Sequence, residues 1–348
     1  MKRFLNVVMI ILLLIAVLTS CSSNKVVNAP SQGSSVPTTT APTTSPTNAP
    51  TNAPTVISKL KIGDYVQMGK YYDEPILWRC VDIDANGPLM LSDRILTLKP
   101  FDAAGEHKYL DGTLQKDYES DRKNKGSNLW ETSNMRAWLN SSAITGNVIW
   151  PDGCPPTKDK VEAGYNGYAN EKGFLADGNF TETERGAILE ITQKSLLYKL
   201  DVSKLSLGGT GEYIFGSNIS SIVKNFDTAY YHNLNEKMFL LDVKQENKVF
   251  LNSSTLGTNY YIGKPTQKAV DNSEFKDARL IPENNCFSRL RSPDAGSASD
   301  VIVIDPEGRV GSNSVSTGLI GARPAFYIDL TSAILKSGTG TESDPFVV

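Results

Sequence analysis

The chain has 348 residues, of which 40% are hydrophobic and 21% charged, and its formal net charge is −3. This composition is globular rather than disordered, and the length is sufficient to bury a core. A slightly acidic chain without a basic stripe argues against nucleic acid as a partner.

The first 20 residues have the pattern of a lipoprotein signal peptide. Lys2 and Arg3 precede an apolar run over residues 5–18 that only Asn6 interrupts, and this run is too short for a membrane span. The following Leu18-Thr19-Ser20-Cys21 resembles a bacterial lipobox. We therefore predict cleavage before Cys21, acylation of that cysteine by fatty acids such as palmitate, and a lipid anchor on the extracellular face of the membrane. The alternative is an ordinary secretory signal with a coincidental cysteine.

A stalk is predicted over residues 21–56. No charged residue occurs between Val26 and Ser58, and Thr-Asn-Ala-Pro is repeated at 47–50 and 51–54. Such a segment buries too little apolar surface to offset the entropy of ordering. We expect a disordered, partly polyproline-like spacer that holds the remaining domain, residues 57–348, away from the membrane.

The first elements of this domain are predicted to form a β-hairpin. Ile76–Ile83 and Leu89–Leu96 are strand-like runs, and Asn86-Gly87 between them is a strong hairpin signal. The same region offers oxygen ligands at Asp82, Asp84, Asn86 and Asp93, which approaches the spacing of a calcium loop. A terminal Asp in place of Glu and strand-like flanks favour the hairpin over a calcium site, so we expect no cofactor.

Short helices and strands alternate irregularly along the rest of the domain. Ser133 is placed to cap a helix within Trp130–Leu139, and capping-box spacing begins at Thr181 and again at Asp242. Further strands are predicted at Met238–Leu241, Val301–Ile304 and Ala325–Leu330, with a turn at Asp305-Pro306-Glu307-Gly308. This mixture predicts a loop-rich α+β domain.

Cysteine and histidine give little support for catalysis or zinc. Beyond Cys21, the cysteines are Cys80, Cys154 and Cys286, without any Cys-x-x-Cys. One pair of them could form a disulfide, but we favour buried, unpaired thiols. His107 and His232 lie in polar surroundings and are expected to be exposed loop residues. No Gly-x-Ser-x-Gly motif is present, and no pair of the 38 acidic residues stands out as catalytic.

The segment Gly164–Asn170 is the candidate ligand-binding surface. Its residues Tyr165, Asn166, Tyr168 and Asn170 combine rigid amphipathic rings with small amide side chains, a mixture found on recognition surfaces. The alternative is a solvated loop whose tyrosines lie on the body of the domain.

A series of short blocks carries a family resemblance. In order they are Trp78–Val81, Leu91–Leu96, Trp130–Ser133 with Arg136–Asn140, Phe239–Val243, Leu290–Pro293 and Gly321–Ala325. Together, from about Ile62 to Leu330, they resemble a domain of unknown function common on surface and secreted proteins of Gram-positive, clostridia-like bacteria. The last blocks are also similar to sulfatase-modifying-factor and C-type-lectin-like folds, which implies a compact body closed near a Gly-x-Arg. One departure is Ser288-Arg289, where relatives commonly have aromatic residues.

These observations favour a non-catalytic surface module that binds an extracellular glycan or protein. The alternatives are an enzyme that acts on wall polymers through an unrecognised acid pair and a structural presentation domain without a ligand. Arg291 and Arg323 recur in the family blocks, and we expect them to tie loop carbonyls together. Trp78, Trp130 and Trp138 are predicted to belong to the core.

Overall fold

A computed structural model describes residues 59–348 apart from 117–120, 203–207, 215, 217, 222–223 and 334. The predicted signal peptide, Cys21 and the stalk lie outside the described residues. Within the described part of the chain, no helix is both long and apolar enough to cross a membrane. The described residues all belong to the predicted globular domain.

The predicted hairpin forms the centre of a six-stranded sheet. β2 (Glu74–Asp84) and β3 (Gly87–Ser92) pair in antiparallel fashion, and Asp84 lies opposite Gly87 at the turn. The φ angle of Gly87 is 105°, a conformation that glycine adopts readily and side-chain-bearing residues avoid. The hairpin prediction is confirmed, although β3 ends earlier than predicted.

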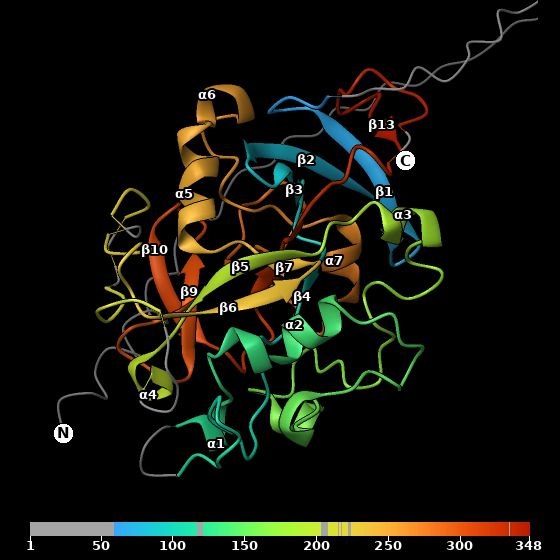
Figure 1. The fold of residues 1–348 in the computed structure, drawn as a ribbon. Coiled ribbons are helices and arrows are strands. Elements are labelled where there is room, and N and C mark those ends of the chain that lie inside the picture. The colour runs from blue at the N-terminus through green and yellow to red at the C-terminus, as the bar shows by residue number, and fades with distance from the viewer. Residues whose placement is uncertain are drawn as a thin grey trace, which may run out of the picture. The chain divides into compact units, whose positions relative to one another are not determined.

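The other strands of this sheet come from both ends of the domain. The order is β13-β1-β2-β3-β12-β7, and only β13 and β1 are parallel to each other. The C-terminus therefore lies beside the first strand (Figure 1). The added strands are β1 (Tyr65–Tyr71), β7 (Phe239–Leu240), β12 (Pro324–Tyr327) and β13 (Phe346–Val347).

A five-stranded sheet has the order β10-β9-β8-β11-β4. β8 and β11 are parallel, and the other neighbours are antiparallel. A separate antiparallel pair joins β5 (Ile191–Leu196) to β6 (Tyr231–Glu236). The five strands are β4 (Thr97–Leu98), β8 (Ser288–Pro293), β9 (Asp300–Ile304), β10 (Val310–Ser314) and β11 (Gly321–Ala322), so the predicted strand before the Asp305–Gly308 turn is confirmed.

The helices are short, and three of them begin at the predicted caps. Ser133 accepts a hydrogen bond from Arg136 N at the start of α2 (Asn134–Leu139), after the 3₁₀ turn η1 (Trp130–Thr132). Thr181 and Asp242 form complete capping boxes at α3 (Glu182–Gly186) and α5 (Val243–Leu251), and α5 packs against β2 (Figure 1). The remaining helices are α1 (Arg122–Lys125), η2 (Pro151–Gly153), η3 (Lys158–Lys160), α4 (Lys199–Val202), α6 (Ser253–Leu256) and α7 (Gln267–Asn272). The domain is α+β, as predicted.

The three predicted core tryptophans are fully buried. Their indole N–H groups donate to Met68 O for Trp78, to Glu236 Oε2 for Trp130 and to Lys172 O for Trp138. A buried indole is stable only when this group has an acceptor, so each ring is held in one orientation.

The two family-block arginines tie loops together, as predicted. Arg323 donates to the carbonyls of Ser92, Asp93 and Tyr260. Arg291 donates to Leu240 O and, at 2.8 Å, to the carboxylate of Asp242. Both guanidinium groups are buried, and these acceptors satisfy hydrogen-bond donors that would otherwise be costly to bury.

The expectation of exposed loop histidines is wrong. His107 is buried, with Nε2 2.9 Å from Ala103 O and 3.5 Å from Asp102 Oδ2, and Nδ1 3.8 Å from Asp152 Oδ2. His232 is half-buried in β6, where Nδ1 lies 2.7 Å from Glu131 Oε2. Asp152 and Glu131 are distant in sequence from the histidines that they approach, so the polar neighbours along the chain gave no indication of burial.

Candidate functional site

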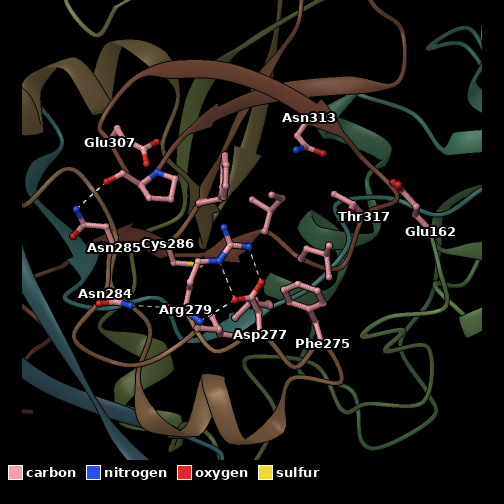
Figure 2. A pocket seen from close by; sticks show the side chains of 16 residues that line it. Glu162, Phe275, Asp277, Arg279, Asn284, Asn285, Cys286, Glu307, Asn313 and Thr317 are labelled. Carbon is pink, nitrogen blue, oxygen red and sulfur yellow. Dashed lines mark hydrogen bonds and ion pairs between the residues drawn. The ribbon is translucent and has the colours of Figure 1, made fainter. Parts of the chain in front are cut away.

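A pocket of about 640 Å³ opens among the loops of the five-stranded sheet. Its sixteen lining residues come from the α7–β8 connection, the β9–β10 turn, β10 and the segment after it, together with Leu98 and Glu162 (Figure 2). This volume is within the range of pockets that hold small molecules. We therefore take this pocket as the candidate functional site.

Much of the lining is apolar. Leu98 and Leu280 belong to a small buried cluster that is separate from the main core, and Phe275 packs against that cluster. An apolar group that entered the pocket would leave water, which favours its binding. The apolar side chains of the lining are Leu98, Phe275, Leu280, Phe287, Leu319 and Ile320.

Polar side chains lie around this apolar lining. Glu307 and Asn285 stand on one side, and Asn313, Thr317 and Glu162 stand on the other (Figure 2). The pocket thus combines an apolar interior with carboxylate and amide groups that could orient a ligand.

An internal ion pair occupies the lower part of the pocket in Figure 2. Arg279 donates from Nε and Nη2 to the two carboxylate oxygens of Asp277, at 3.0 and 2.7 Å. These hydrogen bonds, reinforced by the Arg279 N–H, lower the pKa of Asp277 to about 2. Asp277 is therefore ionised at neutral pH and unsuited to donate a proton.

Cys286 is the one cysteine among the lining residues, and all three cysteines in the described part of the chain are unpaired. Its side chain is half-buried, and burial raises the pKa of its thiol to about 11. The thiol is protonated at neutral pH, so it is a weak nucleophile. It provides a chemical probe of access to the pocket.

Part of the predicted ligand-binding segment supports the pocket from outside. Asn166 is buried, and its amide donates to Gly318 O at 2.7 Å and accepts from Glu274 N at 2.7 Å. Tyr165 is half-buried, and its ring meets that of Phe275 edge to face, with the centroids 5.8 Å apart. These two residues hold the α7–β8 connection against the segment that follows β10.

The other two residues of that prediction point elsewhere. Tyr168 is buried in the main core, where its hydroxyl donates to Pro100 O at 3.1 Å. Asn170 is exposed. The four residues therefore do not form one exposed surface, and none of them is among those that line the pocket.

The structure gives no support to the alternative of a calcium site at the hairpin. Asp84 accepts from Asn86 N at 2.8 Å and from the Tyr327 hydroxyl at 2.7 Å. Asp82 and Asp93 are half-buried. Among the residues that the structure describes, no three His, Cys, Asp or Glu side chains are grouped so as to hold a metal ion.

Sequence reasoning did not identify the pocket residues. Phe275, Arg279 and Phe287 lie in a connection without regular secondary structure, and Asn313 comes from a strand that carried no motif. They come from segments far apart in the chain and meet only in the folded domain. The Asp305–Gly308 turn was predicted, but nothing in it indicated that Pro306 and Glu307 line a pocket.

The fold and the pocket define an α+β domain with a cavity lined largely by loops. The family described as "Domain of unknown function (DUF6273)" matches residues 86–330, and the chain belongs to this family. The match begins after the Trp78–Val81 block and includes all the later blocks on which the resemblance rests. Neither the curated proteins nor the solved structures contain a match to the chain.

Proposed function

We propose that the domain is a non-catalytic binding module, displayed on the cell surface by a lipid on Cys21, whose ligand is an extracellular glycan or protein. The observation that supports it best is the pocket of about 640 Å³, with its apolar interior and polar edge. The uncharged stalk supports the same function, because a spacer is useful when the cargo must reach a partner beyond the membrane.

The chemistry of the lining favours binding over catalysis. An acid pair for cleavage of wall polymers needs one carboxyl group with a raised pKa. The pKa of Asp277 is instead lowered by Arg279, and the carboxyl groups with raised pKa values in the described part of the chain, those of Asp102 and Glu246, are not among the pocket residues. The raised pKa of Cys286 argues in the same way against a thiolate nucleophile.

A pair of tryptophan variants tests the proposal. Asn313 faces the pocket from β10, whereas its neighbour Ser312 is exposed on the opposite face of the strand, because successive strand side chains alternate. N313W should obstruct the cavity with its indole ring and abolish binding, and S312W should leave binding unchanged. The purified full chain and both variants would be screened against immobilised glycans, wall fragments and extracellular proteins.

The proposal requires a ligand that binds to the wild type and to S312W but not to N313W. Failure to find any ligand, or a ligand that N313W binds normally, would remove the proposal. Mass analysis of the recovered ligand separates the enzyme alternative, since a binding module returns its ligand uncleaved.

A further inference from the structure

The connection between α7 and β8, which lines the pocket, also exposes large apolar side chains to solvent. Phe287 lines the pocket and is 37% exposed, and Ile281, on the same α7–β8 connection, is 42% exposed. Exposed apolar side chains beside a cavity add surface that a partner could cover, and contiguous patches of this kind mark sites of interaction with proteins or other ligands. A ligand confined to the cavity would contact Phe287 but would leave Ile281, which does not line the pocket, in water.

Many polar groups around the pocket already form hydrogen bonds within the chain. Asn284 Nδ2 donates to Arg279 O at 3.0 Å, and Asn285 Nδ2 donates to Pro306 O at 2.9 Å. The Nε and Nη2 groups of Arg279 are held by Asp277. A sugar carries hydroxyl groups all around its ring, and each one that is buried needs a partner. An apolar side chain has no such requirement and suits this lining better.

The lining residues carry an excess of negative charge. They include the carboxylates of Glu162, Asp277 and Glu307 but one guanidinium group, that of Arg279. Asp277 neutralises Arg279, and Glu307 shares a 2.7 Å contact with Arg309. Glu162 is exposed, and within the described residues no salt bridge within 4.0 Å engages its side chain. The edge is therefore complementary to a cation.

We infer that the pocket receives an apolar side chain of a protein partner, with a basic residue beside it that meets Glu162. This inference rests on the proposed function and names its ligand class. Ile281 and Phe287 would contact the flanking backbone and side chains of the partner. The apolar side chain provides most of the affinity, because it is removed from water, whereas the exposed charge contributes less and mainly selects among partners.

Defined probes can test both elements of this ligand. They are the blocked tripeptides Lys-Leu-Lys, Lys-Ser-Lys and Glu-Leu-Glu, with an oligosaccharide of N-acetylglucosamine as the glycan probe. The readout is the rate at which a methanethiosulfonate reagent modifies Cys286 of the full chain, resolved by peptide mapping from the other cysteines. Cys80 and Cys154 are buried and serve as internal references.

We expect Lys-Leu-Lys to slow modification of Cys286. Lys-Ser-Lys should need at least about a tenfold higher concentration, because serine lacks the buried leucine surface. Glu162→Gln should weaken protection by Lys-Leu-Lys about two- to fivefold, as an exposed ion pair would. Glu190→Gln removes another exposed carboxylate outside the pocket and should have no effect.

The result that overturns the inference is equal protection by Lys-Ser-Lys or Glu-Leu-Glu, protection by the oligosaccharide alone, or no protection by any probe. Protection by the oligosaccharide that N313W abolishes would leave the binding function intact and change its ligand to a glycan. The proposed binding function is tested separately. It is contradicted if the ligand screen finds no molecule whose binding is lost in N313W.

Discussion

Replacing Glu246 with glutamine should stabilise the domain at neutral and alkaline pH but not at acid pH. Glu246 lies on α5 and is buried, and its Oε1 has no hydrogen-bond partner among the described residues. Burial raises the pKa of this carboxyl from 4.5 to about 7, although the charge of Arg323 opposes the rise. The folded protein therefore keeps a proton that the unfolded chain releases.

The sign and size of the effect follow from this difference. Between pH 4.5 and about 7 the unfolded state is ionised while the folded state is not, so the free energy of unfolding falls as the pH rises. Each pKa unit corresponds to about 1.4 kcal/mol, which gives a loss of about 3 kcal/mol that is complete above pH 7. Glutamine keeps the shape of the side chain and cannot ionise, so it avoids this loss.

Urea unfolding followed by tryptophan fluorescence, from pH 4.5 to pH 8.5, measures the effect. The stability of E246Q relative to the wild type should increase across this range and level off above pH 7. Glu190→Gln, at an exposed position, should show no comparable trend. A difference between E246Q and wild type that stays constant with pH would refute the reasoning, because it would mean that Glu246 is ionised in the folded protein throughout.

Three further outcomes are expected. Asp242→Ala should lower the free energy of unfolding by about 3–5 kcal/mol in urea, because it removes the cap of α5 and the carboxylate that is hydrogen-bonded to the buried Arg291, leaving Glu236 at 3.9 Å as the nearest one. A chelator should leave the melting midpoint unchanged, since Asp84 already accepts hydrogen bonds from Asn86 N and from the Tyr327 hydroxyl. A lower midpoint would support a calcium site at this loop. Cys21→Ser should abolish incorporation of a labelled fatty acid, and persistent labelling would contradict the predicted anchor.

The features that could be predicted depend on residues close together in the chain. The Asn86-Gly87 turn and the capping boxes at Thr181 and Asp242 are each complete within a few residues, so the sequence contains all of their chemistry. The burial of Trp78 follows from its size and its apolar surroundings. Local patterns of this kind were confirmed almost wherever they were strong.

The features that were missed depend on contacts between distant segments. His107 stands among polar neighbours and is nevertheless buried, because Asp152, from a distant segment, adds a second carboxylate to that of the nearby Asp102. Asn166 has the composition of a recognition residue, yet Gly318 and Glu274, more than 100 residues away, use its hydrogen bonds. No periodicity or motif encodes such pairings, and the pocket is built from the same kind of contact.

The family blocks and the pocket use different parts of the chain, and this separation bears on function. The blocks supply Arg291 and Arg323, which hold the sheets, whereas no lining residue of the pocket falls within a block. Arg289 stands where the resemblance leads us to expect an aromatic residue. Its buried guanidinium donates to the carbonyls of Ser314 and Thr317, in the segment that forms one wall of the pocket. The blocks therefore supply the scaffold, and under the proposed function the ligand would be selected by residues of the same family domain that lie outside these blocks.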